Sequence, residues 1–269
     1  MGLYKRRMKF IAIANQKGGV GKTTTAVNLG ACLAERGVRT LILDLDPQAN
    51  STSSFGYTPG EHDSVYAALT GDADIADLVL PTQYKNLSII PSEQDLAGCE
   101  IEMASEGDRL IRLKGILEDF RHSNVADYVF MDCPPSLGVM MTSALAAADE
   151  LLIPLQCEYF GLEGVAKIVD LHEQIRNSGA DLNVILEGIV FTMADSRTNL
   201  STSVINDVRG VFGDVTYQTV IPRNISLSEA PSFSQTILEY APSSAGATAY
   251  RQLAEEFLKR HAAVPAAVE

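Results

Sequence analysis

A glycine-rich run near the amino terminus carries the residues best suited to chemistry. It reads Lys17, Gly18, Gly19, Val20, Gly21, Lys22, Thr23 and Thr24. Glycines lack a Cβ atom, so the main chain can turn tightly and direct its N–H groups at phosphate oxygens. We expect Lys22 to reach the terminal phosphates of a nucleoside triphosphate and the Thr23 hydroxyl to bind Mg²⁺. The usual first glycine of such a loop is replaced by Gln16, and Lys17 adds a further cation.

Carboxylates follow two other apolar runs. Asp44 and Asp46 come at the end of one run, and Asp132 comes at the end of another. A carboxylate at a strand end beside a phosphate loop can hold Mg²⁺ or orient the attacking water. We therefore assign Asp46 and Asp132 to the site, whereas Asp44 can equally be a turn residue.

These residues need a scaffold that brings strand ends together. Short β-rich apolar runs alternate with helix-like segments, which predicts an α/β fold with a mostly parallel, twisted sheet and helices on both faces. Ligands bind such sheets at the carboxyl ends of the strands, where the motifs fall. Without an internal repeat or a composition break, we predict a single domain over residues 1–269. The predicted strands are 10–14, 40–45, 87–90, 128–131, 151–155, 185–192 and 217–221.

Composition narrows the function further. The formal net charge is −13, so any nucleic-acid contact must come from a local basic patch. The four cysteines form no CxxC pair, which indicates a reducing cytoplasm rather than a disulfide framework. No run is long enough for a signal peptide or a spanning helix. We interpret residues 1–7 as an extension before an alternative start at Met8, and residues 261–269 as a flexible tail.

The run from Lys17 to Thr24 resembles the deviant Walker A ATPases, a P-loop NTPase group that includes ParA/Soj partition proteins, MinD and the nitrogenase iron protein. Three further segments resemble ParA/Soj in particular: 44–48, 132–138 and 222–231. The likeness covers nearly the whole chain. It implies ATP and Mg²⁺ as cofactors and an ATPase activity.

The resemblance also implies roles for individual residues. Lys17 would cross a nucleotide-sandwich homodimer to the partner's phosphates, although the sequence leaves open whether it acts in cis or in trans. Gly18, Gly19, Val20, Gly21, Lys22, Thr23 and Thr24 would bind phosphate and Mg²⁺. Asp46 would position the hydrolytic water, Asp132 would be the Walker B carboxylate, and Pro222, Arg223 and Asn224 would lie against the adenine.

In this family, ATP closes a dimer that binds DNA non-specifically, and a ParB-type partner triggers slow hydrolysis and release. That cycle would place the protein in the cytoplasm, associated with the nucleoid, for chromosome or plasmid partitioning. Arg197 matches a basic residue of the DNA surface. Two positions depart from the pattern: Ser226 replaces a cation of that surface, which weakens the case for strong DNA binding, and Ala49 replaces a glycine in a switch loop.

Three alternatives remain open. The first is a ParA-like ATPase that positions another protein cargo. The second is a MinD-like membrane ATPase, which needs a basic amphipathic carboxyl-terminal helix; residues 257–260 only hint at one, so we expect no membrane partner. The third is a reductase with an iron–sulfur cluster on Cys99 and Cys133, for which buried inert thiols are the simpler interpretation.

Overall fold

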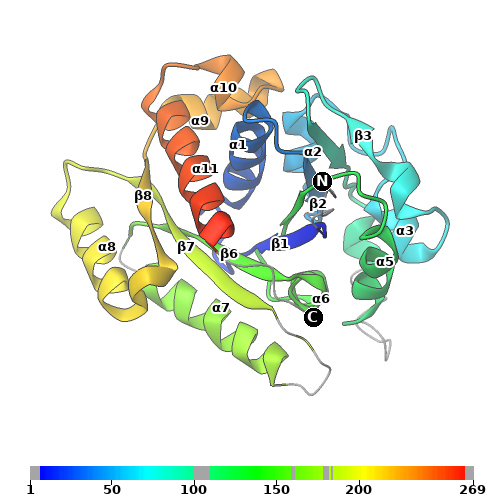
Figure 1. The fold of residues 1–269 in the computed structure, drawn as a ribbon, viewed down its shortest axis with the longest axis horizontal. Coiled ribbons are helices and arrows are strands. Elements are labelled where there is room, and N and C mark those ends of the chain that lie inside the picture. The colour runs from blue at the N-terminus through cyan, green and yellow to red at the C-terminus, as the bar shows by residue number, and fades with distance from the viewer. Residues whose placement is uncertain (1–6, 100–109, 159–160, 178–181, 183, 264–269) are drawn as a thin grey trace, which may run out of the picture.

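The computed structural model describes residues 7–99, 110–158, 161–177, 182 and 184–263. Its core is an eight-stranded sheet in the order β3-β4-β2-β5-β1-β6-β7-β8 (Figure 1). Neighbouring strands pair in parallel, except that β3 and β4 are antiparallel. The strands are β1 Lys9–Ile13, β2 Thr40–Asp44, β3 Leu80–Pro81, β4 Leu87–Ile90, β5 Tyr128–Asp132, β6 Glu150–Gln156, β7 Ile185–Ala194 and β8 Thr216–Pro222.

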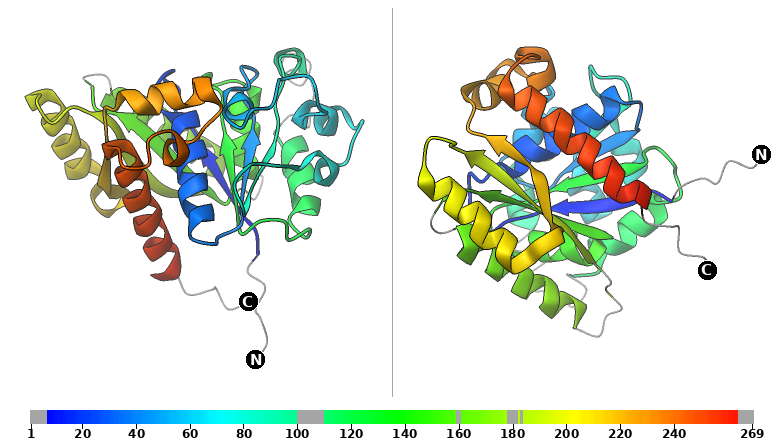
Figure 2. Two further views of the ribbon diagram at one scale, coloured as in Figure 1. Left: turned by 90° about the horizontal axis from the view of Figure 1, so that it is seen from above. Right: turned by 60° about the vertical axis from the view of Figure 1, so that its left-hand side comes forward.

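Helices connect the strands and cover both faces of the sheet. The α-helices are α1 Lys22–Glu35, α2 Asn50–Ser54, α3 Val65–Thr70, α5 Arg112–Phe120, α6 Val139–Ala147, α7 Gly161–Arg176, α8 Asn199–Phe212, α9 Ile225–Glu229, α10 Ile237–Tyr240 and α11 Ala245–Ala263. Short 3₁₀ turns are η1 Ile75–Leu78, η2 Gly213–Val215 and η3 Ala230–Phe233. Figures 1 and 2 show α1, α10 and α11 on one face and α3, α5, α6, α7 and α8 on the other.

The central strands are buried on both faces because successive side chains point to opposite sides of a sheet. In β1, Phe10 and Ala12 join the apolar cluster under α6 and α7, while Ile11 and Ile13 join the cluster under α1 and α11. All four side chains are fully buried. This explains why the strand reads as an uninterrupted apolar run, and it confirms the predicted fold class.

Each of the seven predicted runs is a strand, with ends that differ by no more than two residues. The strand that the sequence did not reveal is β3, which has only two residues, Leu80 and Pro81. So short a strand shows no alternation, and proline is a poor strand former. It pairs with β4 and closes one edge of the sheet.

The opposite edge is β8, and a carboxylate covers part of it. Glu256 of α11 accepts hydrogen bonds from the main-chain N–H groups of Gln218 and Thr219, at 2.7 and 2.8 Å. Edge strands otherwise present such groups to other chains. Both edges of this sheet are thus blocked, one by Pro81 and the other by Glu256.

The last helix extends into the segment predicted to be a tail. α11 continues through Ala263, because His261 packs against Phe257 and its Nε2 atom lies 2.7 Å from Glu150 Oε2. The rest of that segment, 264–269, and residues 1–6 of the predicted extension lie outside the described residues. Within the described part of the chain, no helix combines the length and apolar character needed to cross a membrane.

Candidate functional site

The glycine-rich loop joins β1 to α1 and leaves the start of α1 uncapped. Gly19 and Gly21 have φ angles of 72° and 90°, a left-handed conformation that glycine adopts without steric cost. Gly21 is the residue before the helix, and within the described part of the chain no side chain caps the first N–H groups of α1. These groups, together with the positive end of the helix dipole, form a binding site for an anion.

Two side chains from neighbouring segments hold this loop in place. Asn15 accepts a hydrogen bond from the Lys17 N–H at 3.0 Å and donates one to the Pro154 carbonyl at 2.8 Å. Thr192, in β7, donates to the Val20 carbonyl at 2.8 Å. The loop is therefore tied to β6 and β7 before any ligand binds.

The two loop lysines have different environments. Lys22 is 6% exposed, and burial lowers its pKa while the charges of Asp132 and Asp46 oppose the shift. Lys17 points to another partner, because its Nζ atom lies 3.1 Å from Glu158 Oε2. The same carboxylate lies 3.7 Å from Arg223. Glu158 thus links the phosphate loop to the segment that follows β8.

The strand register brings the carboxylates together. β2 and β5 are neighbours, and Asp44 is paired with Asp132 at their carboxyl ends. Burial raises the pKa of both groups, and the charge of Asp132 adds to the effect on Asp44. The neighbouring hydroxyls of Thr23 and Ser51 and the Lys22 ammonium pull the pKa of Asp132 back down.

Asp132 and Asp44 differ in what they can still bind. Ser51 donates to Asp132 Oδ2 at 2.8 Å, while Asp132 Oδ1 is buried without a hydrogen-bond partner. Asp44 Oδ2 instead accepts bonds from the N–H and the hydroxyl of Thr52, at 2.9 and 2.7 Å. Asp132 therefore has a free oxygen for a ligand, whereas Asp44 secures helix α2.

Asp46 lies just beyond β2, in the turn that leads to α2. Its side chain is 8% exposed, and Oδ1 accepts the Gln48 N–H at 2.9 Å. Ala49 follows with φ 51°, so the residue that replaces a glycine adopts the left-handed conformation for which glycine is best suited. The replacement therefore places backbone strain beside the site.

A small cavity of about 100 Å³ continues the site toward β8. The predicted residues Pro222, Arg223 and Asn224 line it together with Gly21 and Thr24 of the loop. Asn224 Oδ1 is buried without a hydrogen-bond partner. The structure thus brings the phosphate loop, two carboxylates and the 222–224 segment to one end of the sheet.

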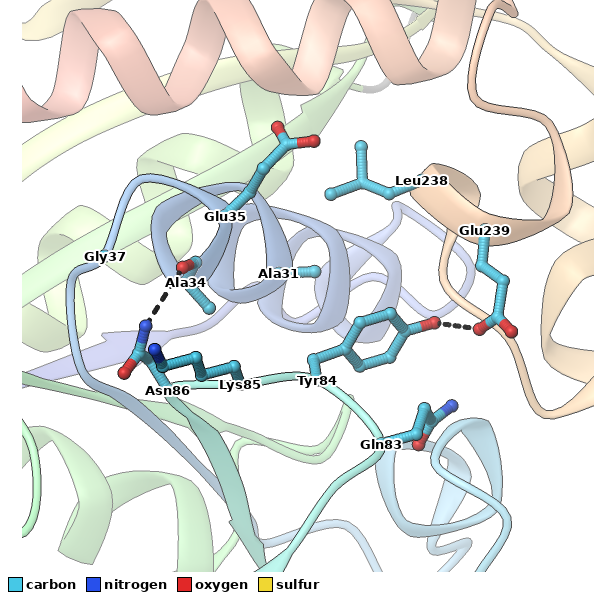
Figure 3. Close-up of a pocket in the computed structure, with 10 residues that line it drawn as sticks. All are labelled: Ala31, Ala34, Glu35, Gly37, Gln83, Tyr84, Lys85, Asn86, Leu238 and Glu239. Carbon is cyan, nitrogen blue, oxygen red and sulfur yellow. Dashed lines mark hydrogen bonds between the residues drawn. The ribbon is translucent and has the colours of Figure 1, made fainter.

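A larger cavity of about 670 Å³ lies elsewhere, against the far half of α1, the β3–β4 turn and α10 (Figure 3). Its acids are already engaged. Glu239 accepts a hydrogen bond from Tyr84 at 2.6 Å, and Glu35 pairs with Arg251 at 3.0 Å. The smaller cavity is the better candidate for a ligand site because Asn224, whose Oδ1 atom has no hydrogen-bond partner, lines it beside the uncapped start of α1.

Arg197 lies apart from this constellation, in the connection between β7 and α8. Its side chain is 85% exposed and forms an ion pair with Asp195 at 2.8 Å. Ser226, on α9, supplies no charge where the resemblance implies a cation. Arg197 is accessible to a polyanion, but an acid of the same chain already balances its charge.

The two cysteines considered for a cluster, Cys99 and Cys133, lie in the core. Cys99 and Cys133 are both buried, and burial together with Asp132 raises the pKa of Cys133, which keeps it a neutral thiol. Cluster ligands are thiolates, so these surroundings favour inert core cysteines. No group of three or more His, Cys, Asp or Glu side chains in the described ranges could hold a metal ion.

Sequence reasoning did not find several residues that organise the site. Asn15 could have been recognised, because an asparagine directly after a strand and before a glycine turn is a common loop anchor. Thr192 and Ser51 gave no such signal. Their partners are 172 and 81 residues away in the sequence.

Comparisons with known proteins agree with this geometry. A family model described as an AAA domain matches residues 8–187. The chain is 47% identical over 249 residues to the sporulation initiation inhibitor protein Soj of Bacillus subtilis, which covers 92% of this chain and 97% of that protein. The chain belongs to the ParA/Soj family. It is also 45% identical to the chromosome partitioning protein ParA of Caulobacter vibrioides, over 94% of this chain and 95% of that protein.

Solved structures support the ParA/Soj architecture. A cobyrinic acid a,c-diamide synthase from Mycobacterium smegmatis, with a bound ATP analogue and magnesium, superposes with a TM-score of 0.80. It is 33% identical and covers 95% of this chain and 96% of that one. The mostly parallel sheet and the loop between β1 and α1 are therefore parts of a fold that holds a nucleotide and Mg²⁺ in a related protein.

Proposed function

We propose that this ParA/Soj protein is an ATP-dependent switch. ATP drives its dimerisation and non-specific binding to nucleoid DNA, and a ParB-type partner stimulates slow hydrolysis to ADP and phosphate. The cycle serves chromosome or plasmid partitioning in the cytoplasm. The observation that carries the proposal is the uncapped start of α1 beside Lys22 and the free Oδ1 atom of Asp132.

The triphosphate would lie on the loop. The N–H groups from Gly18 to Thr24 and the Lys22 ammonium would bind its oxygens, as at other uncapped helix starts. Lys22 is suited to this because its buried charge gains a full set of anionic partners. Adenine would occupy the cavity at Pro222 and Arg223, where Asn224 Oδ1 needs a donor and the exocyclic amino group supplies one.

The residues present fit Mg²⁺. Oxygen donors are the ligands Mg²⁺ prefers, and it usually keeps several waters while one or two protein groups and the phosphates complete its shell. Asp132 Oδ1 is an unpartnered buried oxygen, and the Thr23 hydroxyl lies beside that carboxylate. Thr23, Asp132 and Asp46 would hold the ion, which when bound offsets negative charge on the phosphates.

Hydrolysis would depend on Asp46 and the lysines. Asp46 is buried, close enough for its charge to act on Asp132, and would orient the attacking water. Lys22 and Lys17 would offset the charge that develops on the transferred phosphoryl group. Lys17 pairs with Glu158 within its own chain, so it would have to exchange this partner for a phosphate if it reaches the second nucleotide across the dimer.

DNA binding would be modest. The net charge is −13, and a single exposed cation, Arg197, matches the DNA surface implied by the family. Each phosphate contact adds affinity through counterion release. The dimer doubles the number of such contacts, so binding would depend on ATP.

A second candidate, the positioning of another protein cargo, uses the same switch and differs only in the partner. The membrane alternative fits less well. Leu253 and Phe257 of α11 are fully buried against the sheet, so they are not available to insert into a lipid surface.

The test combines two substitutions. Lys22→Ala should abolish ATP binding, and normal affinity in a fluorescent-nucleotide titration would refute the loop assignment. Asp46→Ala should trap an ATP-bound dimer that hydrolyses little; a monomer with ATP in light scattering would show that Asp46 has another role. DNA binding measured with ATP, ADP and no nucleotide then separates the switch from simple nucleotide binding.

A further inference from the structure

Ser51 lies one residue into the short helix α2 and contacts the Walker B carboxylate directly. Its hydroxyl donates to Asp132 Oδ2 at 2.8 Å, and both residues are fully buried. A buried hydrogen bond to a charged acceptor is stronger than a neutral one. The hydrogen bond therefore fixes Ser51 relative to the Asp132 carboxylate, which is the proposed Mg²⁺ ligand.

This bond decides which oxygen of Asp132 is free. Oδ2 is taken by Ser51, and Oδ1 is left buried without a partner. A carboxylate can rotate about its last side-chain bond, a torsion with broad preferences. The hydroxyl at Oδ2 limits that rotation, so that a single oxygen remains for a cation beside the phosphate loop.

Helix α2 does not need Ser51 to stay in place. Thr52 makes two hydrogen bonds to Asp44, at 2.9 and 2.7 Å. The Thr52 hydroxyl in turn accepts the Ser92 N–H at 2.9 Å, and the Ser92 hydroxyl donates to the Asp46 carbonyl at 2.8 Å. The helix is thus anchored independently, and the bond from Ser51 serves Asp132 rather than the helix.

We propose that Ser51 is a positioning residue for Mg²⁺: it holds Asp132 so that Oδ1 faces the metal site, and it makes Mg²⁺ affinity depend on the placement of α2. The inference rests on the proposed function, because it concerns the same nucleotide site. It adds a residue that touches neither nucleotide nor metal and acts through Asp132. Partners of this kind change metal affinity by about 10- to 100-fold when they are removed.

The test compares Ser51→Ala with Ser54→Ala in the full chain. Ser54 lies in the same helix, is 1% exposed, and donates to the Asn50 carbonyl rather than to a carboxylate. The measurement is the Mg²⁺ concentration that gives half-maximal binding of a fluorescent ATP analogue. We expect Ser51→Ala to raise it about tenfold, Ser54→Ala to leave it unchanged, and metal-free nucleotide binding in EDTA to be the same in both.

Equal Mg²⁺ requirements in Ser51→Ala and the wild type would overturn the proposal, as would an equal rise in Ser54→Ala. If Ser51→Ala does not fold, Ser51→Cys has nearly the same volume and a weaker donor, so it should shift the requirement in the same direction; no shift would again overturn the inference. A wild-type protein that binds no Mg²⁺-ATP would instead refute the proposed function.

Discussion

Arg197 offers a sharp test of DNA binding, because its charge is already balanced within the chain. Its Nε and Nη2 atoms donate to the two oxygens of Asp195 at 2.9 and 2.8 Å. A DNA phosphate that binds Arg197 must replace this carboxylate. Arg197→Ala and Asp195→Asn should therefore change DNA affinity in opposite directions: the first removes a cation, and the second releases one and removes an acid.

The expected size follows from counterion release. Each phosphate contact contributes about −0.9 to the slope of log affinity against log salt, so one contact accounts for about a 3.5-fold loss between about 50 and 200 mM salt. Arg197→Ala should make the slope shallower by about 0.9 for each copy of Arg197 that touches DNA. Asp195→Asn should tighten binding at low salt, because Arg197 no longer has to leave an ion pair.

The assay is fluorescence anisotropy of a labelled random-sequence duplex, titrated with the ATP-bound protein at several salt concentrations. Lys259→Ala is the matched control: it removes one charge from an exposed ion pair on α11, near the opposite ends of the strands. An Arg197→Ala variant with the wild-type isotherm and slope would remove Arg197 from the DNA surface. A similar change in Lys259→Ala would show that net charge alone controls binding.

Three further predictions concern the fold and the loop. Burial raises the pKa of Glu187 from 4.5 to about 7, so the stability that its protonated carboxyl contributes is complete below pH 4.5 and is lost as the pH rises through 7. The loss in the free energy of unfolding is about 3 kcal/mol. Glu187→Gln should flatten the pH dependence of urea unfolding, and an unchanged profile would contradict the assignment. Ser234 has φ 53° and is partly exposed, so Ser234→Gly should stabilise the protein by roughly 1 kcal/mol in thermal unfolding; a lower melting temperature would show that its side chain matters more than the strain. Asn15→Ala removes both hydrogen bonds that Asn15 makes to the phosphate loop and to β6, and should weaken ATP binding about tenfold by calorimetry at unchanged stoichiometry. Wild-type affinity would mean that the loop holds its shape without Asn15.

The sequence was a good guide to the strands and to the end of the sheet where the site lies. Central parallel strands are apolar at consecutive positions, so a run such as 128–131 could hardly be anything else. Asp46 and Asp132 each follow the carboxyl end of a predicted strand, and the structure shows that these two strands, β2 and β5, are neighbours. The strand pattern therefore placed the loop and the carboxylates at one edge of the sheet, whereas the 222–224 segment was assigned to the site only through the resemblance to ParA/Soj.

The pairings inside the site could not be predicted in the same way. Lys17 and Glu158 are 141 residues apart, and a surface ion pair leaves no pattern in the sequence. Thr52 could have faced solvent on so short a helix, and its bonds to Asp44 depend on how α2 packs. Side-chain pairings of this kind follow from three-dimensional packing, whereas the positions of the strands along the chain follow from local apolar periodicity.

The two blocked edges of the sheet limit the ways in which copies of this protein can associate. A second chain cannot readily pair with β3, because Pro81 has no N–H group to donate. It cannot readily pair with β8 either, because the Glu256 carboxylate already accepts hydrogen bonds from the Gln218 and Thr219 N–H groups. In the proposed cycle, the contacts between two copies would therefore form through surfaces other than the edges of the sheet.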